Sequence, residues 1–104
     1  MLPIVELEQG QPRGVVAAGV GMVLVRNETQ TYALGERCPH LGAPMVDGWL
    51  YRGDLVCPWH GSCFELDSGA ATRGPASAPL PCHDVRERDG QIEVRRRPGV
   101  RSEP

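Results

Sequence analysis

The sequence predicts an all-β domain built from small antiparallel sheets, and three observations support this fold class. The 104 residues are too few for two hydrophobic cores, so a single domain over 1–104 is expected. No long stretch shows the apolar repeat of an amphipathic helix. Glycine (13 residues) and proline (10 residues) are frequent, which favours short strands joined by turns.

The N-terminal part of the chain predicts four strands by its alternating apolar pattern: 4–8, 15–18, 22–26 and 31–34. The second and third of these are expected to pair as a hairpin. They flank the sequence Gly19-Val20-Gly21, and glycine is the residue that turns tolerate best.

The C-terminal part predicts four more strands: 54–56, 63–66, 83–88 and 91–95. The last two are expected to form a closing hairpin, because Asp89-Gly90 between them suits the positive φ angles of a tight turn. Residues 96–104 are expected to form a C-terminal tail.

Composition and charge exclude several classes of function. The formal net charge of −2 provides no basic surface field for nucleic acid. The longest apolar stretch, 14–25, is shorter than the ~20 residues that span a bilayer, and no secretory signal is recognisable. We therefore expect a cytoplasmic protein that binds neither nucleic acid nor membrane.

Two short boxes carry the chemistry, Cys38-Pro39-His40 and Cys57-Pro58-Trp59-His60. Each contains one thiol and one imidazole, in a chain with only four cysteines and three histidines. Such a set suits a tetrahedral zinc ion, or a [2Fe-2S] cluster with two Cys on one iron and two His on the other. Zinc fingers usually pair Cys with Cys and His with His, so the mixed boxes favour the cluster.

The boxes, the proline-containing segment 74–81 and the closing hairpin together resemble a Rieske-type [2Fe-2S] ferredoxin. The resemblance extends over roughly residues 4–95. It implies the Rieske-like fold, in which two loops form a cluster-binding subdomain, here about 36–81. Segment 74–81 is similar to the proline loop that covers one side of the cluster in this family.

The resemblance also implies the ligands of one Rieske-type [2Fe-2S] cluster. Cys38 and Cys57 match the family's ligands to one iron, and His40 and His60 match those to the outer iron near the surface. It implies no catalytic residue.

Five neighbouring positions indicate the soluble, low-potential branch. Ala43 and Trp59 stand where respiratory Rieske proteins have a disulfide, and Phe64 stands where they have a hydrogen-bonding Tyr. Ser62 matches a family serine that bonds a bridging sulfide. Leu41 and Ser62 differ from the pattern of oxygenase α-subunits. Trp59 and Leu41 are expected to be partly core residues that shield the cluster from water.

The function implied is that of a monomeric one-electron carrier and not of an enzyme by itself. In this family such a ferredoxin passes electrons from a flavoprotein reductase to a Rieske-type oxygenase. Two alternatives stay open. One is a small Rieske-like subunit of a nitrite reductase or another redox complex, and the other is a zinc-bound interaction module.

Five other residues are expected to have structural roles and not to bind the metal. Cys63 and Cys82 are expected to be two unrelated thiols, with Cys63 facing away from its neighbour in the strand. His83 is expected to be an ordinary strand residue. Gly42 and Gly61 are expected to let backbone N–H groups approach the cluster, because a Cβ atom there would crowd the loops.

Overall fold

The computed structural model describes residues 2–3, 7–17, 19–39, 42–59, 61–74 and 78–95. These contain ten strands and one short 3-10 helix: β1 (Leu2–Pro3), β2 (Arg13–Ala17), β3 (Val20–Asn27), β4 (Gln30–Gly35), η2 (Met45–Asp47), β5 (Trp49–Tyr51), β6 (Asp54–Val56), β7 (Cys63–Glu65), β8 (Ala71–Arg73), β9 (Cys82–Arg88) and β10 (Gln91–Arg95). Within this part of the chain no helix has the length and apolar character needed to cross a membrane.

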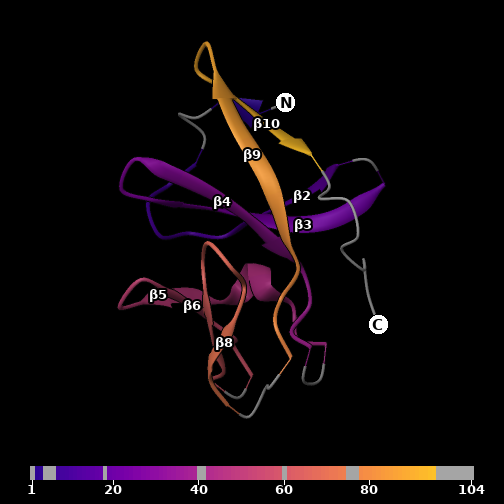
Figure 1. Cartoon of the computed structure of the whole chain (residues 1–104), viewed down its shortest axis with the longest axis vertical. Helices are drawn as coiled ribbons and strands as arrows, with labels where there is room; N and C mark the ends of the chain where they lie inside the picture. Colours follow the sequence, from indigo (N-terminus) through magenta and orange to yellow (C-terminus); the bar gives the residue numbers. More distant parts are fainter. Residues whose placement is uncertain are drawn as a thin grey trace.

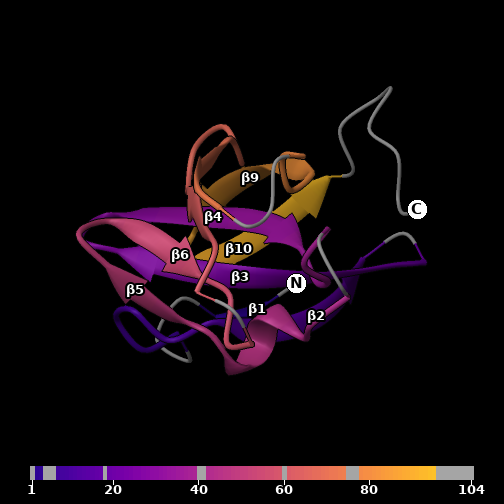
Figure 2. The same cartoon turned by 90° about the horizontal axis from the view of Figure 1, so that it is seen from below.

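The strands form two antiparallel sheets, which confirms the all-β prediction. The larger sheet has the order β1-β10-β9-β4-β3-β2, and the smaller has the order β5-β6-β7-β8. In Figure 1 the smaller sheet lies below the larger one, and in Figure 2 the two are seen from below. Because β4 pairs with β9, the whole smaller sheet is inserted between neighbouring strands of the larger one. The insertion corresponds to the subdomain expected at about 36–81.

A first hydrophobic core lies between the two sheets, and its fully or nearly buried members come from both: Val23, Val25, Leu34, Cys38, Ala43, Met45, Leu55, Cys57, Phe64, Leu66, Leu80 and Cys82. In the smaller sheet, Leu50 pairs with Leu55 and Leu55 with Phe64. Successive residues of one strand face opposite sides of a sheet, whereas residues paired across neighbouring strands face the same side. These three paired side chains therefore form the inner face of the smaller sheet.

A second, smaller core covers the other face of the larger sheet and consists of Leu7, Val20, Met22, Leu24, Ala33 and Ile92. Strand β3 contributes to both cores, since Met22 and Leu24 alternate with Val23 and Val25. This continuous apolar run shows that β3 is buried on both faces, and β4 likewise contributes Leu34 to the first core and Ala33 to the second.

Two hairpins turn through a pair of residues with positive φ. Asp89 and Gly90 have φ angles of 52° and 74° between β9 and β10, as the sequence predicts. Arg52 and Gly53 have φ angles of 52° and 85° between β5 and β6. Both angle pairs match the turns that suit the right-handed twist of a hairpin.

The predicted hairpin of β2 and β3 is present, but its turn is tighter than expected. Ala17 pairs with Val20, so Gly21 belongs to β3 and not to the turn. A Cβ atom on Gly21 would lie 2.4 Å from the carboxylate of Glu36. That carboxylate is the far end of an exposed side chain and could move aside, so this contact alone does not require a glycine. Ala18, the expected end of the first strand, lies outside the described residues.

The strand expected at 4–8 is not supported where the structure describes it. Leu7 and Glu8 lie outside any strand, and residues 4–6 are not among the described ones. The N-terminal strand is β1 instead, which pairs with β10. The expected tail, 96–104, also lies outside the described residues.

Candidate metal centre

Two loops carry the two boxes, the first loop (residues 38–43) and the second loop (residues 57–62), and the described residues of both make the same two backbone hydrogen bonds. The Cys38 amide donates to the Ala43 carbonyl (2.9 Å), and the Cys57 amide donates to the Ser62 carbonyl (2.7 Å). Each loop therefore closes on itself through a bond from its cysteine to the fifth residue beyond it.

A second backbone hydrogen bond repeats in the same way. The Gly42 amide donates to the Cys38 carbonyl (2.8 Å), and the Gly61 amide donates to the Cys57 carbonyl (3.2 Å). Gly42 and Gly61 both have φ of 79°, a backbone conformation that side chains disfavour. No described atom lies within 4 Å of a Cβ built on either glycine, so the described part of the loops does not show the expected crowding. The positive φ explains these glycines.

The ends of the loops are fixed by the fold. The first loop is closed by an antiparallel bridge between Arg37 and Pro44 and by a bond from the Met45 amide to the Glu36 carbonyl (2.8 Å). The second loop joins β6 to β7, whose residues Val56 and Cys63 pair directly.

The two expected thiol ligands are both buried at the start of their loops. Cys38 and Cys57 are each 2% exposed and belong to the same core between the sheets. None of the four cysteines, all of which are described, forms a disulfide. Two thiols in equivalent loops fit the Cys pair that a Rieske-type cluster requires. His40 and His60 lie outside the described residues, so the structure places two of the four expected ligands.

The residues around the thiols are mostly buried. Ser62, Phe64 and Ala43 are all 0% exposed. Trp59, in contrast, is 55% exposed, so the expectation that it packs partly in the core is wrong. Leu41 lies outside the described residues.

The segment expected to act as a proline loop is partly described. Leu80 is almost fully buried, and its amide donates to the Gly69 carbonyl (2.8 Å). Next to it, the Gly35 amide donates to the Pro81 carbonyl (2.8 Å), which joins the end of this segment to β4. Residues 75–77 lie outside the described part of the chain.

The remaining thiols and the third histidine have separate surroundings. Cys63 donates to the Gly61 carbonyl (Sγ···O 3.5 Å), and Cys82 donates to the Leu66 carbonyl (3.8 Å). The two thiols form no disulfide, as the sequence predicts. Cys63 also faces away from Phe64, since the inner face of the smaller sheet belongs to Phe64. His83 is buried in β9 opposite Ala33.

The sequence did not indicate an aromatic groove beside the second loop. Trp49 and Tyr51 on β5 are each about half exposed. They line a cavity of about 380 Å³ whose other lining residues are Val56, Gly61, Cys63, Arg73 and Gly74. The signal was present in the chain, because β5 alternates large aromatic side chains on one face and Leu50 on the other.

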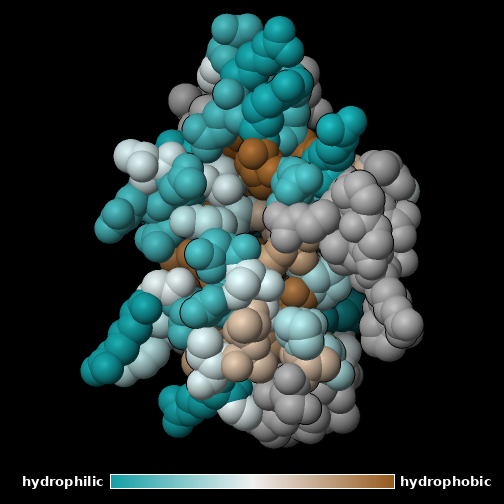
Figure 3. Space-filling view, viewed as in Figure 1, coloured by the Kyte–Doolittle hydropathy of each residue, from teal (hydrophilic) through white to brown (hydrophobic). Residues whose placement is uncertain are grey.

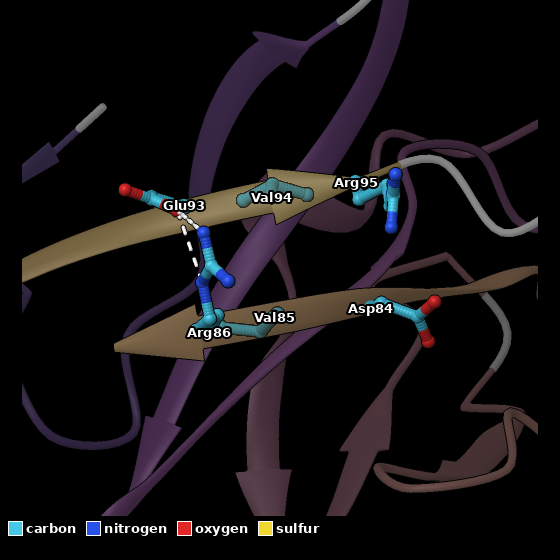
Figure 4. Close-up of a pocket in the computed structure, with 6 residues that line it drawn as sticks. All are labelled: Asp84, Val85, Arg86, Glu93, Val94 and Arg95. Atoms are coloured by element: carbon cyan, nitrogen blue, oxygen red, sulfur yellow. Dashed lines mark hydrogen bonds and ion pairs between the residues drawn. The ribbon is translucent and has the colours of Figure 1, made fainter. Parts of the chain in front are cut away.

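The opposite end of the molecule is hydrophilic. In Figure 3 this end, at the top, holds the turn between β9 and β10. Figure 4 shows a shallow charged pocket on these strands, where both Nε and Nη2 of Arg86 donate to Oε1 of Glu93 (3.1 and 2.6 Å). This bond holds the pKa of Glu93 below its ordinary value. The pocket lies on different strands from the two loops, so we assign it no part in the metal centre.

A family model described as the Rieske [2Fe-2S] domain matches residues 1–84. The chain is 39% identical over 90 residues to human apoptosis-inducing factor 3, covering 86% of this chain but only 15% of that protein. It is 28% identical to the ferredoxin subunit of anthranilate 1,2-dioxygenase from Burkholderia cepacia, covering 86% of this chain and 82% of that one.

The solved structures that match this chain include ferredoxins of the same kind. The ferredoxin of carbazole 1,9a-dioxygenase from Nocardioides aromaticivorans matches with a TM-score of 0.85 and 26% identity, over 88% of this chain and 90% of the other. A complex of oxygenase and ferredoxin of carbazole 1,9a-dioxygenase matches with a TM-score of 0.84 and 26% identity, over 91% of this chain and 98% of the other. A protein assigned as the small subunit of an NADH-dependent nitrite reductase from Mycobacterium tuberculosis matches with a TM-score of 0.81 and 26% identity, over 90% and 89%.

Proposed function

Because this chain belongs to the Rieske [2Fe-2S] domain family, we propose that it is a one-electron carrier of the ferredoxin type. The observation that carries the proposal is the pair of equivalent loops, each starting at a buried cysteine that forms no disulfide. A cluster bound there would supply reversible one-electron chemistry at iron.

The ligand set that we propose follows the two boxes. Cys38 and Cys57 would hold one iron, and His40 and His60 would hold the other. Phe64 and Leu80, both almost fully buried, belong to the same core as the two thiols, and this core would keep water away from the cysteine side. The proposal assigns no bond-making step to any residue of this chain.

For partners we propose a flavoprotein reductase as donor and a Rieske-type oxygenase as acceptor. Support comes from the ferredoxin components of dioxygenase systems that the chain resembles over most of their length. In the carbazole 1,9a-dioxygenase complex the ferredoxin is bound to its oxygenase. We propose a monomer that acts in the cytoplasm.

A second candidate is the small subunit of a nitrite reductase, favoured by the match to the Mycobacterium tuberculosis protein. An interaction module that binds zinc is the third. The chain covers only 15% of apoptosis-inducing factor 3, so that protein's activity suggests no further candidate.

The test is anaerobic purification followed by metal, sulfide and redox analysis. We expect two irons and two acid-labile sulfides per chain, an uptake of one electron on titration with dithionite, and no zinc. A stoichiometric zinc content without sulfide would contradict the proposal. Reoxidation by a candidate oxygenase, compared with reoxidation by a nitrite reductase large subunit, separates the two redox candidates.

A further inference from the structure

The two loops differ in what holds the carbonyl group of their equivalent glycines. The Gly42 carbonyl in the first loop accepts a hydrogen bond from Nη1 of Arg37 (3.2 Å). The Gly61 carbonyl in the second loop accepts one from the Cys63 thiol (3.5 Å). The two backbone bonds described in each loop are the same, so these side-chain donors are a chemical difference between the loops.

The two donors differ in strength and in charge. A guanidinium is permanently charged and donates charge-assisted hydrogen bonds, whereas a thiol is a weak and neutral donor. Gly42 connects Arg37 to the thiol-bearing residue, because its carbonyl accepts from Arg37 and its amide donates to the Cys38 carbonyl. Arg37 itself directly precedes Cys38 in the chain. The side-chain contact at Gly42 therefore holds a positive charge beside the first loop. The corresponding contact at Gly61, in the second loop, comes from a neutral thiol.

We propose that Arg37 is a positioning residue of the metal centre, which holds the first loop through the Gly42 carbonyl and raises the reduction potential of the centre by its charge. The inference rests on the proposed function. One-electron reduction adds one negative charge, and a nearby cation stabilises the more negative form. Cys63 holds the second loop in the same way without adding charge.

The exposure of Arg37 makes the effect measurable without unfolding the protein. The side chain lies at the surface, where a single charged contact contributes little to global stability. For the same reason its field is screened by salt. If Arg37 raises the reduction potential through its charge, this effect must decrease as ionic strength rises. If Arg37 acts only by positioning the first loop, the effect must persist at high salt.

The test compares midpoint potentials of three variants of the cluster-loaded protein at low and high salt. Arg37→Gln should shift the reduction equilibrium about two- to tenfold towards the oxidised form, where tenfold equals about 59 mV for one electron. Arg37→Lys keeps the charge and should retain most of the native potential. Arg88→Gln, which removes the same charge at the far end of β9, should leave it unchanged. The shift caused by Arg37→Gln should shrink at 1 M salt.

The positional part of the proposal has its own readout in amide hydrogen exchange. Arg37→Gln should accelerate exchange in the peptide that contains Gly42 and leave the peptide with Gly61 unchanged, and Cys63→Ala should do the reverse. Native potentials and native exchange in Arg37→Gln would overturn this inference while leaving the proposed function standing. A native protein that holds no iron and sulfide would overturn both.

Discussion

Gly69 lies so close to Leu80 that a Cβ atom on the glycine would stand 2.0 Å from the Leu80 carbonyl oxygen. The Leu80 amide also donates to the Gly69 carbonyl (2.8 Å), and Gly69 has φ of 75°. This contact joins the turn after β7 to the segment that leads into β9. It therefore holds the smaller sheet against the larger one.

Gly69→Ala should destabilise the fold severely, because it combines positive φ with a collision against backbone. We expect a loss of about 3 kcal/mol or more in the free energy of unfolding, measured by urea denaturation. The matched control is Gly53→Ala, which also has positive φ (85°) but no described atom within 4 Å of its Cβ position. That variant should lose only about 1–2 kcal/mol. Equal losses in the two variants would show that the contact with Leu80 contributes nothing.

Cys57→Ser and His60→Ala should each lose the visible absorption of the cluster, since both remove a proposed iron ligand. The thermal transition should fall as well, because metal binding is coupled to folding in small domains. Cys63→Ser is the matched control, a buried cysteine one residue beyond the second loop that is not a proposed ligand. It should keep iron, sulfide and colour. A His60→Ala protein with full iron and sulfide would disprove the ligand assignment.

The native reduction potential should lie in the lower part of the Rieske range of roughly −150 to +300 mV, below about 0 mV. Phe64 has no hydroxyl with which to stabilise the reduced state, and it lies in the same core as Cys38 and Cys57. Phe64→Tyr should raise the potential by tens of millivolts if its hydroxyl reaches a ligand sulfur. Because Phe64 is 0% exposed, the added oxygen should also cost about 1–3 kcal/mol of stability. Protein-film voltammetry measures the potential, and a native value near +300 mV would point to a quinol-linked role.

The Arg86–Glu93 pair should make stability depend on acidic pH. Arg86 donates to the carboxylate and lowers the pKa of Glu93 in the folded protein. The unfolded chain then binds a proton more readily, so the pair's contribution is present above the unfolded pKa and is lost as the pH falls through the folded pKa. Arg86→Gln should flatten the acid side of the curve of unfolding free energy against pH. The effect should be small, because the pair is at the surface, and Arg88→Gln should reproduce only a lesser part of it, since the charge of Arg88 also lowers the pKa of Glu93 but less than Arg86 does.

The chemistry of this protein was predictable from the sequence because it depends on residue types at short spacing. The mixed Cys and His boxes indicated a Rieske-type centre, and the family match agrees. The Asp89-Gly90 turn was also predictable, because its φ angles depend on two neighbouring residues. Longer strands such as β3 show enough apolar residues to be recognised.

The sequence analysis did not predict the three-residue strands β5 and β8, although it did predict β6 and β7, which are equally short, because so few residues do not by themselves separate a strand from a loop. They exist as strands because β6 and β7 supply their backbone hydrogen-bond partners. The sequence also does not reveal why a glycine is needed where the cause is a contact with a residue that is distant in the chain. Gly69 looks like an ordinary turn glycine in the sequence, but the backbone carbonyl of Leu80 approaches it in space.

By itself, the sequence determined the fold class, the expected ligands and the family, since each is encoded in local patterns of residue type. Only the tertiary structure decided that the first and second loops are equivalent and that Arg37 holds Gly42 while Cys63 holds Gly61. It also decided that Trp59 is exposed. These features depend on how separate segments pack together, and packing arises from contacts between residues that are distant in the chain.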